Sequence, residues 1–131
     1  MSDCCCGTKD VMLLACSGGS NVGQIANDAA KALDQLGQGR MYCAVGVNAG
    51  LPSFVEAAKN AATLVAIDGC DVACVKKGLA QVGITPHVYV VATDLGIEKG
   101  HHFNYTRDEV AEVAGAVARA LQGDSCCKQE K

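Results

Sequence analysis

Cysteine is the residue type in this chain that stands out for its chemistry. The sequence has nine cysteines among 131 residues, and an odd number of thiols cannot all pair within one molecule. Two of them, Cys70 and Cys74, lie four positions apart in the stretch AIDGCDVACVKKG. Such a pair can open and close a disulfide, form half of a metal site, or fill space as small apolar side chains. The pair alone does not distinguish these roles.

A helix that contains the pair would suit either the metal or the redox chemistry. Residues four apart lie on one helix face with Cβ atoms about 5–6 Å apart, and zinc–sulfur bonds of about 2.3 Å fit that separation. The partial positive charge of a helix N-terminus favours the thiolate over the thiol. The same field would also make Cys70 a nucleophile, so both chemistries stay open at this point.

The overall composition excludes several classes of protein. Half of the residues are apolar and 19% are charged, as in globular domains. The net charge of −3, without a basic stripe, argues against a nucleic-acid surface. No apolar run approaches the roughly 18 residues that cross a bilayer, and the start MSDCCCGTKD lacks the pattern of a secretory signal. We therefore expect a cytoplasmic protein with no nucleic-acid or membrane partner, in a compartment where thiols stay reduced. No particular protein partner or oligomeric state is indicated.

Four short apolar runs predict the strands that position the cysteines. They are continuously hydrophobic, as in a parallel sheet covered on both faces, and they are VMLLAC (11–16), MYCAV (41–45), LVAIDG (64–69) and HVYVVA (87–92). Amphipathic segments alternate with them, and a capping box of Thr106 and Glu109 opens the last. The alternation predicts an α/β fold, a small three-layer Rossmann-like domain over 10–122. Residues 1–9 and 123–131 are expected to be flexible tails that contain cysteines.

The expected strand order brings four thiols together. Right-handed crossovers with helices on both faces make 2-1-3-4 the simplest order for four parallel strands. Ligands of such sheets bind at the carboxyl ends of the strands, where the order reverses. Cys16 ends the first strand, and Cys43 lies towards the end of the second. Cys70 follows the third strand, and Cys74 is placed in the first turn of a helix that begins at Asp71. The order therefore predicts that these four cysteines converge on one crevice.

The turn CSGGSNVGQIA, after the first strand, is a second candidate site. Gly18 and Gly23 match the glycine spacing of a phosphate loop, but Gln24 and Ile25 replace its Lys and its Ser or Thr. ATP or NAD use is therefore not indicated, and small residues also suit a tight strand-to-helix turn. Binding of a small anion or nucleotide at 17–24 remains a hypothesis.

Other polar residues near this edge have simpler interpretations. Asp94, His101 and His102 could supply extra metal ligands or an acid–base group, although adjacent histidines in a polar loop are more often merely exposed. The remaining assignments are structural: Ser20 or Asn21 caps the first helix, Asp68 and Asp71 fix the turn and cap the next helix, and Lys76 and Lys77 face solvent.

The five other thiols lie near the chain ends, at Cys4, Cys5, Cys6, Cys126 and Cys127. The last helix should end near the start of the first strand, so both groups belong to the amino edge of the sheet. They form a looser thiol site there, for metal or intermolecular disulfides, or they are accidental cysteines of flexible tails. Counting bound zinc after removal of both tails separates these two interpretations.

The motifs CSGGSNVGQ, MYCAVG and above all AIDGCDVACVKKGL resemble the DGC-domain family, which is named after the central Asp-Gly-Cys and regarded as zinc-binding. The similarity extends from about Val11 through the last helix. It implies a zinc ion held by four cysteines, and the matching positions are Cys16, Cys43, Cys70 and Cys74. It implies no established catalytic activity.

Three hypotheses follow from the sequence. The first is a cytoplasmic zinc-binding α/β domain with these four ligands, in which the zinc is structural, sensed or in transit. The second is a thiol-dependent redox or sulfur-transfer protein, with Cys70 as nucleophile and Cys74 or Cys16 as resolving thiol. The third is the anion binder at 17–24. Thiolates also accept iron or an iron–sulfur cluster, so the identity of the metal stays open.

Overall fold

The computed structural model describes residues 10–124, so the two terminal segments and their five cysteines lie outside the described residues. A parallel sheet of four strands forms the centre, in the order β2-β1-β3-β4. The strands are β1 (Val11–Ala15), β2 (Arg40–Met41), β3 (Thr63–Asp68) and β4 (Val88–Val91). The predicted α/β class and the predicted strand order are confirmed.

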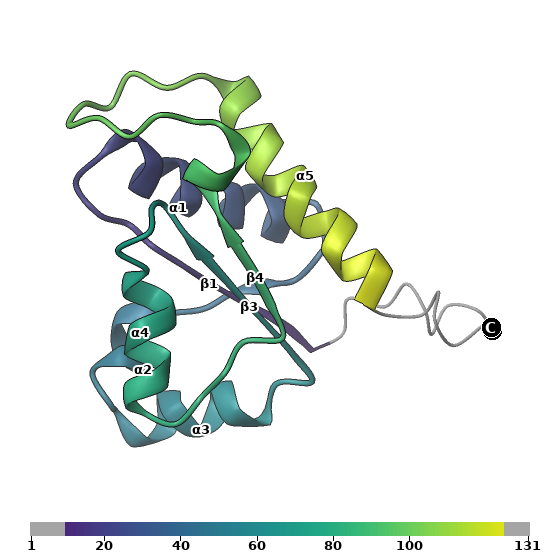
Figure 1. Cartoon of the computed structure of the whole chain (residues 1–131). Coiled ribbons are helices and arrows are strands. Elements are labelled where there is room, and N and C mark those ends of the chain that lie inside the picture. Colours follow the sequence, from purple (N-terminus) through teal and green to yellow (C-terminus); the bar gives the residue numbers. More distant parts are fainter. Residues whose placement is uncertain (1–9, 125–131) are drawn as a thin grey trace, which may run out of the picture.

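Helices cover both faces of the sheet, as Figure 1 shows. One face is covered by α1 (Asn21–Gln35) and α5 (Arg107–Asp124), and the other by α2 (Ala44–Asn48), α3 (Pro52–Asn60) and α4 (Cys74–Gln81). A short 3₁₀ helix, η2 (Ala92–Leu95), follows β4. In the part of the chain that the structure describes, none of the helices combines the length and apolar character that a membrane crossing requires.

The hydrophobic core lies on both sides of the sheet, which explains why the strands are apolar without alternation. In β1, Leu13 faces the layer of α1 and α5, and Leu14 faces the opposite layer. Both side chains are fully buried. A strand covered on two faces needs apolar residues at consecutive positions, because successive side chains point to opposite faces.

The ends of α1 and α5 follow the expected capping chemistry. Ser20 caps α1, because its Oγ accepts a hydrogen bond of 3.1 Å from the backbone N–H of Gly23. At α5, the Thr106 N–H donates to Glu109 Oε1 at 3.0 Å and the Glu109 N–H donates to Thr106 Oγ1 at 3.1 Å. This reciprocal pair confirms the predicted capping box.

The prediction of a strand over 41–45 is wrong in its extent. β2 ends at Met41, and the chain turns into α2 at Ala44. Cys43 caps this helix, since its Sγ accepts a hydrogen bond of 3.3 Å from the Gly46 N–H. Gly46 leaves room for the ring of Phe54, because a Cβ there would overlap it. Tertiary packing therefore decides the structure of a run whose composition alone suits a strand.

The expected start of the fourth helix is also wrong. α4 begins at Cys74 rather than Asp71, and the residue before it, Ala73, has the left-handed conformation with φ 59°. Cys70 lies in the turn that precedes the helix, where the Ala73 N–H donates to the Cys70 carbonyl at 3.1 Å. Cys70 therefore does not lie on a helix face together with Cys74. The argument that a spacing of four residues places both thiols on one face does not hold.

Candidate functional site

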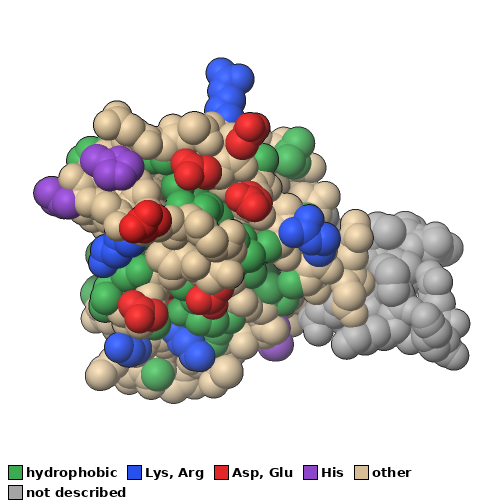
Figure 2. All heavy atoms as spheres, turned by 45° about the horizontal axis from the view of Figure 1, so that its top comes forward, with side chains coloured by type: hydrophobic (Ala, Val, Ile, Leu, Met, Phe, Trp, Pro, Cys, Tyr) green, Lys and Arg blue, Asp and Glu red, His purple; other side chains and the backbone are tan. Residues whose placement is uncertain are grey.

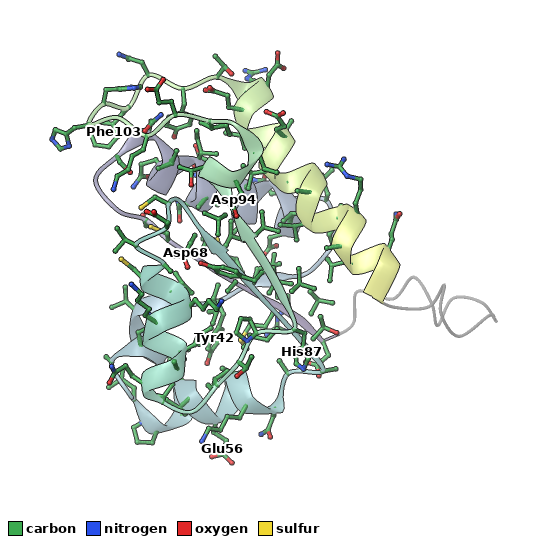
Figure 3. The ribbon with its side chains drawn as sticks, viewed as in Figure 1. Tyr42, Glu56, Asp68, His87, Asp94 and Phe103 are labelled. Atoms are coloured by element: carbon green, nitrogen blue, oxygen red, sulfur yellow. The ribbon has the colours of Figure 1, made fainter. Side chains whose placement is uncertain are left out.

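Four cysteines lie at the carboxyl edge of the sheet. Cys16 directly follows β1, and Cys74 is the first residue of α4. Cys43 lies two residues after the end of β2, and Cys70 lies two residues after the end of β3. None of the four forms a disulfide. Cys43 and Cys74 are exposed, whereas Cys16 and Cys70 are partly buried. Figure 3 shows sulfur atoms beside the first turn of α4, at this end of the sheet.

These thiols share an edge without forming a closed site. Among residues 10–124, no group of three or more Cys, His, Asp or Glu side chains is arranged to hold a metal ion. Thiols are nevertheless the ligands that zinc prefers in structural sites, and the parallel strands bring all four to one edge. The donor set thus fits a thiophilic metal in its chemistry, but the described side chains are not arranged as the ligands of one ion.

Two of the sulfur atoms accept hydrogen bonds from backbone N–H groups. The Gly18 N–H donates to Cys16 Sγ at 3.3 Å, and the Gly46 N–H donates to Cys43 Sγ at the same distance. Burial raises the pKa of the Cys16 thiol, and the bond from Gly18 opposes that rise. Bonds of this kind favour anionic sulfur, but at Cys16 burial has the larger effect, so the pKa of this thiol remains raised.

Cys70 has a cation beside it. The Nζ of Lys99 lies 3.3 Å from Cys70 Sγ. Lys99 belongs to the segment between η2 and α5, which we call the strap (residues 96–106). Sequence reasoning assigned no role to this lysine. No short motif marks it, because the contact joins residues that are 29 positions apart.

The strap is held against the start of α1 by Asn21. The Asn21 side chain donates to the Glu98 carbonyl at 2.9 Å and accepts from the Gly100 N–H at 2.7 Å. The Asn21 N–H also donates to the Gly100 carbonyl at 3.2 Å. Asn21 is almost completely buried, so it positions the strap, whereas Ser20 caps the helix. The only sequence signal for this role was a polar residue near the expected start of the first helix.

Asp68, at the end of β3, connects three elements. The residue is 1% exposed. Its carboxylate accepts hydrogen bonds from the Val75 N–H at 2.9 Å, the Lys76 N–H at 3.1 Å and the Tyr89 hydroxyl at 2.8 Å. Figure 3 shows it between β3 and the first turn of α4. Burial, followed by the bond to Asp68, raises the pKa of Tyr89 above its usual range. Asp68 thus caps α4 from the end of β3, as predicted. Ala73, which occupies the N-cap position of α4, has no side-chain acceptor for this role.

Glycines at this edge permit close backbone contact. A Cβ at Gly69 would lie 2.7 Å from the backbone carbon of Val22, in the first turn of α1. A Cβ at Gly23 would lie 2.8 Å from the backbone of Gly18. The glycine spacing that resembles a phosphate loop is therefore explained by packing of the turn against itself and against β3.

The other polar candidates do not join the thiols. His101 and His102 are exposed. The Nδ1 of His101 lies 3.1 Å from the Gly19 carbonyl, and the Nδ1 of His102 accepts from the Asn104 N–H at 3.0 Å. Asp94 and Asp71 are also exposed. In Figure 2, acidic and basic side chains are interspersed over the visible face, with hydrophobic groups between them.

Comparison with known proteins places the four cysteines inside a recognised family domain. The family description "DGC domain" matches residues 12–117, a span that includes all four cysteines of the carboxyl edge. A relative from Pseudomonas aeruginosa PAO1, the "Anaerobic and virulence modulator AnvM", is 38% identical over 88 residues. The alignment covers 67% of this chain and 67% of that protein. No solved structure matches the chain.

Proposed function

Because the chain belongs to the DGC domain family, we propose that it binds one zinc ion at the carboxyl edge of the sheet. The ligands are Cys16, Cys43, Cys70 and Cys74. The observation that supports the proposal is that four free thiols lie at the edge of the sheet where α/β proteins bind their ligands. The proposed location is the cytoplasm, where such thiols remain reduced.

Zinc binding requires the thiol-bearing segments to close. Cys43, the N-cap of α2, and Cys70, in the turn before α4, lie outside the strand pairing, so they can move without breaking the sheet. Metal ligation supplies the free energy for such closure, because zinc–thiolate sites are commonly formed together with the metal. Hydrogen bonds from Gly18 and Gly46 already support two of the sulfurs. The N-terminus of α4, at Cys74, adds a partial positive charge next to the anionic site.

The proposed role is regulatory rather than catalytic. The relative's name describes a modulator of anaerobic and virulence functions, and we extend a modulating role to this chain. Exposed thiolates are oxidised readily, and oxidation removes them as ligands. Occupancy of the site would therefore respond to both zinc supply and oxidants.

Metal analysis under reducing conditions tests the zinc site. We expect about one zinc per chain, with little iron, and its loss in single Cys→Ser variants of each of the four ligands. The matched controls are Cys126→Ser and Cys127→Ser, which are outside the proposed ligand set and should retain the zinc. Unchanged zinc content in Cys43→Ser or Cys70→Ser would overturn the assignment.

A second candidate function is thiol redox chemistry, and the contact between Lys99 and Cys70 favours it. In that mechanism the Cys70 thiolate attacks a substrate disulfide and releases one substrate thiol. Cys74 or Cys16 then displaces the second substrate thiol, which leaves an internal disulfide and a substrate reduced by two electrons. Metal-free protein with a Cys70–Cys74 disulfide, and activity that survives Cys43→Ser, would support this function over zinc binding.

A further inference from the structure

We propose that Lys99 is the charge-compensating residue of the thiolate site, and that Asn21 is the positioning residue that holds Lys99 in place. This inference rests on the proposed zinc site. It concerns two residues outside the four ligands: Lys99 on the strap (96–106), which contacts Cys70 directly, and Asn21 at the start of α1, which contacts the strap.

The position of Lys99 is specific. Its Nζ is 3.3 Å from Cys70 Sγ, although its side chain is otherwise exposed. The neighbouring cations are engaged or directed differently: Lys76 lies over the ring of Tyr89, 4.8 Å from its centroid, and Lys77 is exposed on α4. Among the described residues, Lys99 is thus the lysine whose ammonium group contacts a cysteine sulfur at this edge.

The strap fixes Lys99 from both sides. Asn21 binds the backbone of Glu98 and of Gly100, the two residues that flank Lys99. A residue between two anchored neighbours loses little additional backbone freedom when its side chain reaches Cys70. Burial of Asn21 keeps water from competing for these bonds. The first turn of α1 therefore determines where the Lys99 ammonium lies.

A cation is needed here because of the charge of the site. Four thiolates around one Zn²⁺ carry a net charge of −2, and such charge is unfavourable where sulfur is partly buried. An ammonium within hydrogen-bond distance of one sulfur offsets part of it. Groups that contact metal ligands in this way typically change metal affinity about 10–100-fold when they are removed. Because Lys99 is exposed, the lower end of that range is expected.

Zinc affinity of the full chain, measured by competition with a chromogenic chelator, tests the inference. We expect Lys99→Gln to weaken zinc binding about tenfold and Lys99→Arg to restore most of the loss. Lys77→Gln, a nearby exposed lysine on α4, is the matched control and should leave affinity unchanged. High salt screens charge interactions, so the difference between wild type and K99Q should shrink as ionic strength rises.

Asn21→Ser tests the positioning role. It should weaken zinc binding in the wild-type background and have little further effect in the K99Q background, because the two residues act through the same contact. Equal loss in both backgrounds would show that Asn21 acts only on the fold.

The outcomes separate the two proposals. If the wild-type chain binds no zinc, both the zinc site and this inference fall. If it binds zinc through the four cysteines and K99Q binds it as tightly, only the inference is overturned. Loss of affinity in Lys99→Arg equal to that in Lys99→Gln would also contradict a role for charge.

Discussion

Replacing Asp68 should destabilise the protein more than any other change at a polar residue of the thiol edge. The residue is 1% exposed, and its carboxylate accepts three hydrogen bonds, from two N–H groups of α4 and from the Tyr89 hydroxyl. Asp68→Ala leaves all three donors without their acceptor. Ala73, the residue at the helix N-cap, makes no side-chain bond that could substitute.

The magnitude follows from these contacts. Loss of an N-cap interaction costs about 1 kcal/mol, and up to about 2. A hydrogen bond to a charged group contributes about 1.5–3 kcal/mol, but the donors from Lys76 and Tyr89 are only partly buried, so water can replace part of their bonding. We therefore expect a loss of about 3 kcal/mol for Asp68→Ala and about 1–2 kcal/mol for Asp68→Asn, which keeps one acceptor oxygen.

The assay is urea unfolding of metal-free protein, so that zinc binding does not contribute to the stability. With a slope of about 2 kcal/mol/M, a loss of 3 kcal/mol lowers the midpoint by about 1.5 M. Tyr89→Phe removes one of the three hydrogen bonds and should cost about 1 kcal/mol. This is less than the loss expected for Asp68→Ala, which removes all three. Asp71→Ala, an exposed neighbour, is the control. The reasoning is refuted if Asp68→Ala stays within about 0.5 kcal/mol of wild type, or if Asp71→Ala costs as much.

Three further predictions concern the same edge. Gly69→Ala places a Cβ 2.7 Å from the backbone of α1, so denaturant unfolding should show a loss of about 1–3 kcal/mol; a neutral effect would contradict the close contact. Ala73→Gly relieves a left-handed φ of 59° and should raise the free energy of unfolding by about 0.5–1 kcal/mol, whereas a loss would argue against that conformation. The pKa of Cys16 is raised above its ordinary value of 9.0 by burial, so alkylation of metal-free protein, followed by mass spectrometry, should reach its full rate at Cys16 only at higher pH than for a free thiol. The folded state holds the proton of the Cys16 thiol more tightly than the unfolded state does. The stability that this difference contributes is therefore lost as the pH rises from 9.0 towards the raised pKa of the folded state.

The sheet was predictable because its signal is redundant. Four apolar runs separated by amphipathic segments leave few topologies once crossovers are right-handed, and the order β2-β1-β3-β4 followed. The capping box at Thr106 is local, so it was also readable. The length of β2 was not, because the apolar residues after Met41 pack equally well from a helix, and the Cys43 sulfur acts as a cap.

The position of the four thiols at one edge of the sheet was predictable, and their local geometry was not. Topology placed the cysteines at one edge, since each follows a strand. The conformation of Ala73 has no sequence signal, because alanine rarely adopts a left-handed φ, so the late start of α4 could not be foreseen. The link from Asn21 to the strap, and from Lys99 to Cys70, joins residues far apart in sequence. Such contacts depend on the complete fold.

The shortness of β2 has a consequence for self-association. An edge strand exposes unpaired backbone groups, onto which another chain can add a strand. Here that edge has only two residues, and one of them, Arg40, is exposed and charged. The chain then leaves the sheet to form α2. The edge that carries Cys43 thus offers little template for intermolecular sheet growth, and a protein with reactive thiols is protected there from aggregating through its backbone.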